Sequence, residues 1–367
     1  MRLKKICLTV TTDLTYDQRM IRICTSLAEA GYDVLLTGRK KKGSLPLAKQ
    51  PYRQKRLYTF FEKGKFFYME YNIRLFFYLL TRKADLFCAI DLDTILPVWL
   101  ISSLKKKPRV YDAHELFCEM KEVVTRPAIY RAWKSIEKTC VPKFTEGYTV
   151  NQPIADEFMR MYGVHYGVIR NVPLLKPLDT AITKEKFIIY QGSVNEGRSF
   201  ETLIPAMQWI DIPLVICGDG NFMEELKLLI KKYDVAGKVV LQGLVPPAAL
   251  RQLTQKALIG ITLFENNGQS NYLSLANRFF DYPHAGIPQL CVDYPAYREI
   301  NNQLQIAVVV EDLSPENIAH QINGLLGNET LYAQLCNNCL ELRQQINWEK
   351  EERTLILFYK RLFETIE

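Results

Sequence analysis

The feature that most constrains the fold is an alternation of short apolar runs with longer helical patterns, which continues along the whole chain. Short apolar runs between turn signals are typical of buried strands, and strands that alternate with helices form parallel sheets. A chain of 367 residues with 48% hydrophobic residues has material for about two domains with substantial cores. The sequence therefore predicts an α/β protein of two domains.

The first half contains five predicted strands and one clear amphipathic helix. The strands are expected at residues 5–12, 33–38, 86–91, 109–113 and 147–151, and the helix at residues 17–31. The helix has an apolar stripe and ends at a Gly, as helices commonly do. This pattern predicts one parallel sheet in the first half.

The second half repeats the pattern after a proline-rich stretch, residues 168–186. Strands are expected at residues 187–192, 214–220, 239–243, 259–264, 288–293 and 307–312. Helices are expected from about Ser199 and over residues 246–257. Two helices are expected at the end of the chain, the last from about Trp348. The predicted parts are a domain at 1–170, a linker at 171–186, a domain at 187–345 and a final helix at 346–367. Ligands of such sheets bind beyond the carboxyl ends of the strands.

Charge is distributed unevenly along the chain. Residues 1–180 carry 31 Lys and Arg against 18 Asp and Glu, a net charge of +13, whereas residues 181–367 carry 16 against 22, a net charge of −6. The basic half predicts an acidic partner: a phosphate-bearing substrate, a membrane surface or nucleic acid. Nine scattered Cys fit a reduced compartment, and the apolar N-terminal run is too short for a secretion signal. No charge-free run reaches the roughly 18–20 apolar residues of a membrane span, so a cytoplasmic protein is expected.

Residues 49–83 combine nine Lys and Arg with eleven aromatic residues and two Glu. Basic and aromatic side chains together suit the surface of an anionic membrane. They also suit single-stranded nucleic acid, and they are equally compatible with a pair of ordinary helices with aromatic cores and solvated charges. The local sequence leaves these alternatives open.

Two stretches of the second half could hold an anion. In "YQGSVNEGRSF" (190–200) a strand ends at Gly192, and Arg198 stands at the start of a helix, where backbone amides and a guanidinium suit phosphate. An ordinary strand-to-helix turn with a solvated Arg explains the same residues. The "GDG" at 218–220 lacks the third Gly of a dinucleotide fingerprint and fits a tight turn better.

The stretch "NNGQSNYLSLANRFFDYPHAGIP" (266–288) leads from a polar loop into a helix. Backbone amides near Leu273–Asn277 are expected at that helix start, and Asp281 could accept hydrogen bonds from a ribose. A structural cap or ion-pair partner is the alternative for Asp281. Pro283 predicts a short or kinked helix.

In the first half, "RVYDAHELF" (109–117) places His114 just past a buried strand. A His there could bind a substrate hydroxyl or act near neutral pH, or it could be a satisfied structural His. Its neighbours Asp112 and Glu115 share that ambiguity.

Taken in order, "DQRMIRICTSLAEAGYDV", "VYDAHELF", "YQGSVNEGRSFETLIPAM", "LVICGDGNFMEEL", "VVLQGLVP" and "ANRFFDYPHAGIP" resemble family 4 of the glycosyltransferases over nearly the whole chain. The resemblance implies the GT-B fold, in which two Rossmann-like parallel-sheet domains face each other across a cleft. It also implies a final helix that crosses back onto the first domain. By resemblance, the reaction is the transfer of a sugar from a nucleotide-sugar to an acceptor hydroxyl, with retention at the anomeric carbon and without an obligatory metal.

The resemblance also implies roles for individual residues. Arg198 matches a basic residue that holds the donor diphosphate, and it is expected to act in catalysis. Gly192 matches a Gly that lets the diphosphate approach. Asp281 matches the second acid of a Glu-x7-Glu motif, and this acid binds the donor ribose. The amides of Leu273, Ser274, Leu275, Ala276 and Asn277 match the diphosphate loop. His114 matches a residue near the sugar and acceptor, with Asp17, Arg19 and Glu115 as further acceptor-side candidates.

The chain departs from the family pattern at two positions. Leu273 stands where the first acid of Glu-x7-Glu belongs, and Ser193 stands where relatives often carry a second basic residue. Arg278, where relatives with an Asn-Lys pair carry Lys, could partly compensate.

These observations lead to one expected function and its alternatives. We expect a metal-independent hexosyltransferase without a cofactor, using a UDP- or GDP-linked sugar. Its acceptor would be a lipid-linked or glycan hydroxyl in polysaccharide or glycolipid synthesis, with residues 49–83 on the inner face of a membrane and no nucleic-acid partner. A nucleotide-sugar epimerase and a non-catalytic partner subunit remain alternatives, and the incomplete G-x-G-x-x-G disfavours a dinucleotide oxidoreductase.

Overall fold

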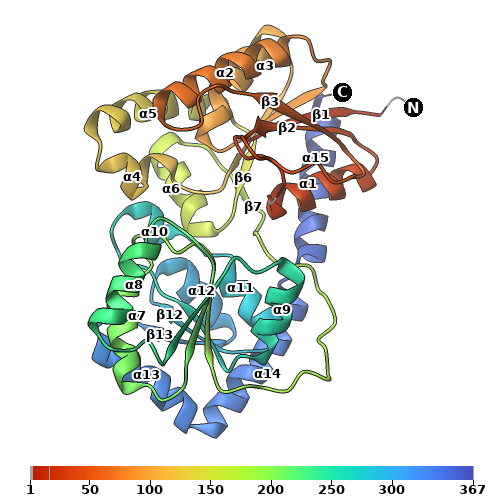
Figure 1. Cartoon of the computed structure of the whole chain (residues 1–367). Helices are drawn as coiled ribbons and strands as arrows, with labels where there is room; N and C mark the ends of the chain where they lie inside the picture. The colour runs from red at the N-terminus through yellow and green to blue at the C-terminus, as the bar shows by residue number, and fades with distance from the viewer. Residues whose placement is uncertain (1–2, 16, 367) are drawn as a thin grey trace. The chain divides into compact units, whose positions relative to one another are not determined.

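The computed structural model describes residues 3–15 and 17–366, which form two compact units (Figure 1). Unit 1 contains residues 1–171 and 350–367, and unit 2 contains residues 172–349. Each unit is built on one parallel β-sheet, as the alternating sequence pattern predicts.

The seven strands of the unit 1 sheet have the order β3-β2-β1-β4-β5-β6-β7. They are β1 (Lys5–Thr9), β2 (Asp33–Lys40), β3 (Arg53–Tyr58), β4 (Leu86–Ile90), β5 (Arg109–Ala113), β6 (Gly147–Thr149) and β7 (Gly167–Val168), all paired in parallel. The chain adds strands on one side of β1 as far as β3 and on its other side from β4 onward. The order therefore reverses between β1 and β4, where the loops diverge and leave room for a ligand.

The helices of unit 1 lie on both faces of this sheet (Figure 1). They are α1 (Gln18–Glu29), α2 (Gly64–Leu80), α3 (Ile95–Leu104), α4 (Lys121–Val124), α5 (Pro127–Cys140), α6 (Gln152–Tyr162) and α15 (Trp348–Ile366), which belongs to unit 1 from Lys350 onward. Helices α2 and α3 pack side by side on one face. On the other face Tyr32, just after α1, stacks on Phe363 of α15 with ring centroids 5.5 Å apart.

Residues 49–83 do not form a pair of helices, so that alternative is wrong. Their first part is β3, an edge strand that pairs with β2, and only the second part is helical. The sequence of β3, "RQKRLY", has no apolar face to signal a strand. Edge strands are commonly charged, and here the backbone of β2 decides the conformation.

The six strands of the unit 2 sheet have the order β10-β9-β8-β11-β12-β13 and pair in parallel. They are β8 (Ile188–Gln191), β9 (Leu214–Cys217), β10 (Val239–Gly243), β11 (Ile259–Thr262), β12 (Gln289–Val292) and β13 (Ala307–Val310). The order reverses between β8 and β11, which therefore form the expected ligand position of this sheet.

The helices of unit 2 also lie on both faces of its sheet (Figure 1). They are α7 (Phe200–Ala206), α8 (Met223–Lys232), α9 (Pro247–Lys256), α10 (Gln269–Leu273), α11 (Arg278–His284), α12 (Pro295–Gln303), α13 (Pro315–Gly327) and α14 (Glu329–Gln345). Three helices follow β13, where the sequence predicted two. Asn328 separates α13 from α14, because its side chain accepts a hydrogen bond from the Leu331 amide at 3.0 Å and so caps a new helix.

Helix α11 is short, as its Pro predicts. Pro283 has no amide hydrogen, so the carbonyl of Phe279, four residues earlier, loses its helical partner. The Gln289 side chain donates to that carbonyl at 2.8 Å instead. The Tyr282 ring lies so close to β11 that a Cβ on Gly260 would meet it at 2.3 Å. These contacts fix the position of α11 against the sheet.

Candidate functional site

The loop after β8 begins with Gly192, which is exposed and has φ +127°. A second glycine, Gly218 after β9, packs directly against it, because a Cβ on Gly218 would lie 1.8 Å from the Gly192 carbonyl oxygen. The Val194 amide donates to the Asp219 carbonyl at 3.1 Å. The "GDG" turn therefore allows two loops to pack backbone to backbone at the carboxyl ends of β8 and β9.

Arg278, the first residue of α11, is buried at 7% exposure beside Gly192. Its Nη1 lies 3.1 Å from the position of a Cβ on Gly192 and 3.3 Å from the Tyr190 hydroxyl. Its guanidinium stacks on the rings of Tyr190 at 4.5 Å and Phe264 at 4.6 Å. Within residues 3–15 and 17–366, its Nε and Nη2 are buried and have no hydrogen-bond partner. Buried charges are normally paired, so these two donors are available to an anion.

Arg198 is the second cation of this site. It lies in the loop before α7, is half-buried, and has its guanidinium 4.5 Å from the centre of the Phe264 ring, the ring on which Arg278 also stacks. Two permanent positive charges on one ring repel each other, and a doubly charged anion would offset that repulsion. The sequence predicted both Arg residues but missed Tyr190 and Phe264. The signal for them was an aromatic residue within the predicted strand at residues 187–192 and another at the end of the predicted strand at residues 259–264.

The predicted row of amides near Leu273–Asn277 is only partly formed, which corrects the expectation that these residues begin a helix. Leu273 closes α10, and α11 starts at Arg278. The Ser274 amide donates to the Asn271 carbonyl at 3.3 Å, and the Ala276 amide donates to the Tyr297 hydroxyl at 3.0 Å. Leu275 is half-buried and Asn277 exposed in the same loop. The Arg278 side chain, more than these amides, offers donors to an anion.

Asp281 lies in the first turn of α11, where a negative charge is favourable. Its Oδ2 accepts a hydrogen bond from Gln191 Nε2 at 2.8 Å. Gln191 is in turn held by the Thr254 hydroxyl, which donates to its Oε1 at 2.7 Å. The half-buried carboxylate is therefore fixed beside the residue that precedes Gly192.

Unit 1 holds a separate cluster around His114 at the carboxyl ends of β4 and β5. The Nδ1 of His114 lies 3.1 Å from Asp91 Oδ2, and its Nε2 lies 2.9 Å from Arg19 Nε and 3.3 Å from Asp112 Oδ2. Burial lowers the pKa of His114, but Asp91 and Asp112 outweigh burial and raise this pKa to about 10. Both ring nitrogens are thus in use within the unit, and a substrate hydroxyl would have to replace one of these partners.

The remaining partners of this cluster are acids that the sequence analysis only partly identified. Asp91 has φ 55° and ψ 173°, a strained combination for a non-glycine residue and one that concentrates at functional sites. Burial and then the charge of Asp91 raise the pKa of Asp93 to about 7 and that of Glu115 to about 7. Asp91 and Asp93 were missed, although an acid at the end of a predicted strand and another two residues later were a visible signal.

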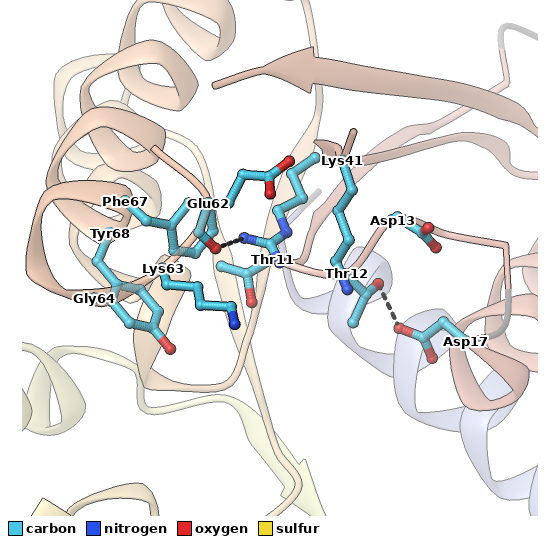
Figure 2. Close-up of a pocket in the computed structure, with 11 residues that line it drawn as sticks. Thr11, Thr12, Asp13, Asp17, Lys41, Glu62, Lys63, Gly64, Phe67 and Tyr68 are labelled. Carbon is cyan, nitrogen blue, oxygen red and sulfur yellow. Dashed lines mark hydrogen bonds between the residues drawn. The ribbon is translucent and has the colours of Figure 1, made fainter. Parts of the chain in front are cut away.

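A cavity of about 740 Å³ in unit 1 (Figure 2) is connected to this cluster through its lining residue Thr11, whose hydroxyl donates to Asp93 Oδ2 at 2.5 Å. Figure 2 shows residues from the start of α2 on one side of it and Thr12, Asp13 and Asp17 on the other. Asp17 caps α1 by accepting from the Met20 amide at 3.1 Å, and it accepts from the Thr12 hydroxyl at 2.9 Å. Of the four acceptor-side candidates, Asp17 lines the cavity, whereas Arg19, His114 and Glu115 belong to the cluster beside it.

Comparison with known proteins gives two sequence matches. Residues 179–341 match the family model described as "Glycosyl transferases group 1", which is less than half of the chain. A segment of 70 residues is 37% identical to N-acetylgalactosamine-N,N'-diacetylbacillosaminyl-diphospho-undecaprenol 4-alpha-N-acetylgalactosaminyltransferase from Campylobacter jejuni, and it covers 18% of this chain and 19% of that protein. Both matches support a glycosyltransferase.

Solved structures resemble the whole chain. A sucrose-phosphate synthase from Thermosynechococcus elongatus has a TM-score of 0.82 at 17% identity and covers 99% of this chain and 100% of its own. WaaG, a glycosyltransferase involved in lipopolysaccharide biosynthesis, has a TM-score of 0.74 at 14% identity, with coverages of 96% and 98%. The fold is GT-B. HepE from Anabaena in complex with UDP-glucose has a TM-score of 0.75 at 11% identity, with coverages of 97% and 99%.

Among residues 3–15 and 17–366, no group of three or more His, Cys, Asp and Glu side chains is placed to hold a metal ion. In unit 2, the guanidinium groups of Arg278 and Arg198 share the Phe264 ring, and Arg278 lies beside the backbone of Gly192.

Proposed function

We propose that the chain is a retaining glycosyltransferase of family 4 that takes a hexose from a UDP- or GDP-linked donor. The observation that carries the proposal is the buried Arg278 guanidinium, with two unpartnered N–H groups beside Arg198 and the bare backbone of Gly192. Two guanidinium forks suit a diphosphate, and a glycine allows its close approach. The complex of HepE with UDP-glucose supports this class of donor for the shared fold.

The proposed chemistry follows from the charges of this site. The bond between the anomeric carbon and the diphosphate oxygen breaks, and negative charge grows on the leaving phosphate. Arg278 and Arg198 stabilise that charge where it develops, and Asp281 accepts hydrogen bonds from the ribose hydroxyls. The acceptor hydroxyl attacks from the face that the phosphate leaves and passes its proton to a phosphate oxygen, which retains the configuration. Because two guanidiniums supply the positive charge, the proposal needs no metal and no cofactor.

The acceptor is assigned to unit 1. Its net positive charge supports an acceptor that carries phosphate, and the relative from Campylobacter jejuni has a name that specifies a diphospho-undecaprenol acceptor. We assign the acceptor to the class of lipid-linked or glycan hydroxyls in polysaccharide or glycolipid synthesis, at the cytoplasmic face of a membrane. His114, Asp17, Arg19 and Glu115 are its proposed surroundings, with His114 fixed by Asp91 and Asp112.

Thermal unfolding with UDP, GDP, dTDP and NAD tests the donor site. A rise in Tm with one nucleoside diphosphate identifies the base, and a screen of its sugars with NMR of the product then reports the anomeric configuration. EDTA should leave the rate unchanged. A shift with NAD alone, or an inverted product, contradicts the proposal. No shift with any nucleotide favours a non-catalytic subunit, and donor conversion without an acceptor favours an epimerase.

A further inference from the structure

Helix α2 of unit 1 is apolar on two faces. Its inward residues Phe67, Tyr71, Leu75 and Leu79 are buried. Its outward stripe consists of Phe66, Met69, Ile73, Phe77 and Leu80, whose side chains are 48, 56, 52, 62 and 40% exposed. Residues three and four apart share a helix face, so the outward stripe is one continuous apolar line along the helix.

Neighbouring residues enlarge this stripe. Phe61, 50% exposed, packs on Phe66 with ring centroids 5.4 Å apart, and Phe60 beside it is 73% exposed. Helix α3, which packs beside α2, exposes Leu100 and Leu104. We call the outward stripe together with Phe60, Phe61, Leu100 and Leu104 the outward patch. Large exposed apolar patches on soluble proteins commonly mark interaction sites.

Positive charge lies at the two ends of the outward patch. The cations near its two ends are Lys63, Lys65, Arg82, Lys83, Lys105 and Lys106. Lys65 Nζ lies 5.2 Å from the Phe66 ring centre, and Lys105 Nζ donates to the Leu80 carbonyl at 2.8 Å. The one acid of α2, Glu70, is neutralised locally, because it accepts from Arg74 at 2.8 Å and from the Phe60 and Phe61 amides.

An apolar centre with a basic rim matches the boundary layer of an anionic bilayer, in which apolar side chains reach the acyl chains and cations meet headgroup phosphates. Helix α2 has 17 residues, or about 25 Å at 1.5 Å per residue, which is shorter than the roughly 30 Å hydrocarbon layer. Within residues 3–15 and 17–366, no helix meets the length and apolarity that a membrane crossing requires. We infer that the outward patch docks unit 1 on an anionic phospholipid bilayer, with α2 lying in the plane of the interface.

Docking would also position the cavity of unit 1. Lys63, Gly64, Phe67 and Tyr68, at the start of α2, line that cavity (Figure 2). A bilayer on the outward patch therefore places the cavity beside the headgroup layer, where an amphiphilic acceptor reaches it without leaving the membrane. This consequence rests on the proposed transfer reaction, whereas the docking itself does not.

Flotation with vesicles tests the inference on the full-length protein. Wild type should float with vesicles of phosphatidylglycerol and phosphatidylcholine, float less at high salt, and float poorly with phosphatidylcholine alone. The double variant Ile73→Ser/Phe77→Ser should bind the anionic vesicles at least about tenfold more weakly, because two apolar side chains no longer enter the interface. A matched control, Leu244→Ser, removes a 79% exposed Leu of unit 2 and should bind like wild type.

The Tm values should agree among these variants, because the replaced side chains point away from the core. Absence of vesicle binding by wild type, or full binding by the double variant, overturns the inference. If wild type does not bind vesicles but forms a dimer or an oligonucleotide complex, and Ile73→Ser/Phe77→Ser abolishes that complex, the patch binds that partner. This result also overturns the inference. Vesicle binding without any nucleotide-induced rise in Tm supports the docking and contradicts the proposed transferase. A nucleotide-induced rise in Tm without vesicle binding supports the transferase and contradicts the docking.

Discussion

Replacing Arg278 by Met separates the stability of unit 2 from its capacity to bind an anion. In the free protein, Nε and Nη2 are buried without partners, and each unsatisfied group costs about 1–3 kcal/mol. Met removes that cost, but it also removes the stacking on Tyr190 and Phe264 and the contact with the Tyr190 hydroxyl, which together contribute about 3 kcal/mol. The cost removed is about 2–6 kcal/mol for the two groups, so we expect the free energy of unfolding to lie between about 1 kcal/mol below and about 3 kcal/mol above that of wild type.

Ligand binding should respond very differently. A ligand at a concentration of about 100 Kd stabilises wild type by about 2.7 kcal/mol, which raises the Tm of a unit of this size by about 5–10 °C. A charge-assisted hydrogen bond contributes about 1.5–3 kcal/mol, so its loss weakens diphosphate binding by roughly 10- to 150-fold. At the same ligand concentration, the Tm of the Met variant should then rise by about 1–4 °C.

Thermal unfolding with and without the nucleoside diphosphate measures both quantities. Arg278→Lys keeps the charge but loses the planar fork, so its ligand shift should be intermediate. Arg298→Met is the matched control, because Arg298 belongs to the same unit but is exposed and paired with Asp293. An undiminished ligand shift in Arg278→Met would refute the assignment of the anion site. A loss of more than about 3 kcal/mol without ligand would instead show that Arg278 is a structural residue.

Three further predictions concern both units. Arg198→Ala should lower nucleotide affinity about tenfold with little change in Tm of the free protein, as isothermal titration and melting can check, because Arg198 is half-buried. Gly218→Ala should destabilise the fold by about 2–4 kcal/mol in denaturant unfolding, since its Cβ would meet the Gly192 carbonyl at 1.8 Å. Because the pKa of Asp93 is raised to about 7, chiefly by burial, its stabilising effect is complete below about pH 4 and lost as pH rises through 7. Asp93→Asn should therefore raise the Tm at pH 8 but not at pH 4. The matching gain in the free energy of unfolding at pH 8 is at most about 4 kcal/mol. Equal effects at both pH values would refute this.

Buried strands were the most predictable part of the fold. The predicted bounds of β5 (109–113) and β10 (239–243) agree with the structure, because an apolar run between turn signals has few other conformations in a parallel sheet. The edge strand β3 was missed because only one of its sides is paired and its side chains need no apolar pattern. The split between α13 and α14 depends on a single capping side chain, that of Asn328, which periodicity does not detect.

The site was less predictable than the sheets, since it depends on contacts between residues far apart in the sequence. A resemblance in motif order pointed to Gly192, Arg198 and Arg278, and the structure brings Arg198 and Arg278 onto one aromatic ring, with Gly192 beside Arg278. The row of amides is only partly formed, because the Tyr297 hydroxyl, 21 residues from Ala276, accepts the hydrogen bond of the Ala276 amide. No local pattern in the sequence announces that contact.

At Ser193 the chain differs from the family pattern that it resembles, and the structure shows how this difference affects the positive charge near the loop after β8. A basic residue at position 193 would bring a second positive charge to the loop after β8, which here carries Arg198 but has Ser at position 193. Arg278 reaches the same loop from α11, with Nη1 3.1 Å from the Cβ position of Gly192. Electrostatic interactions depend on where a charge lies and not on its place in the sequence, so the guanidinium on α11 can supply the positive charge that a basic residue at position 193 would supply. Burial strengthens the effect, because the low dielectric around Arg278 screens its charge less than water would screen a residue on the exposed loop.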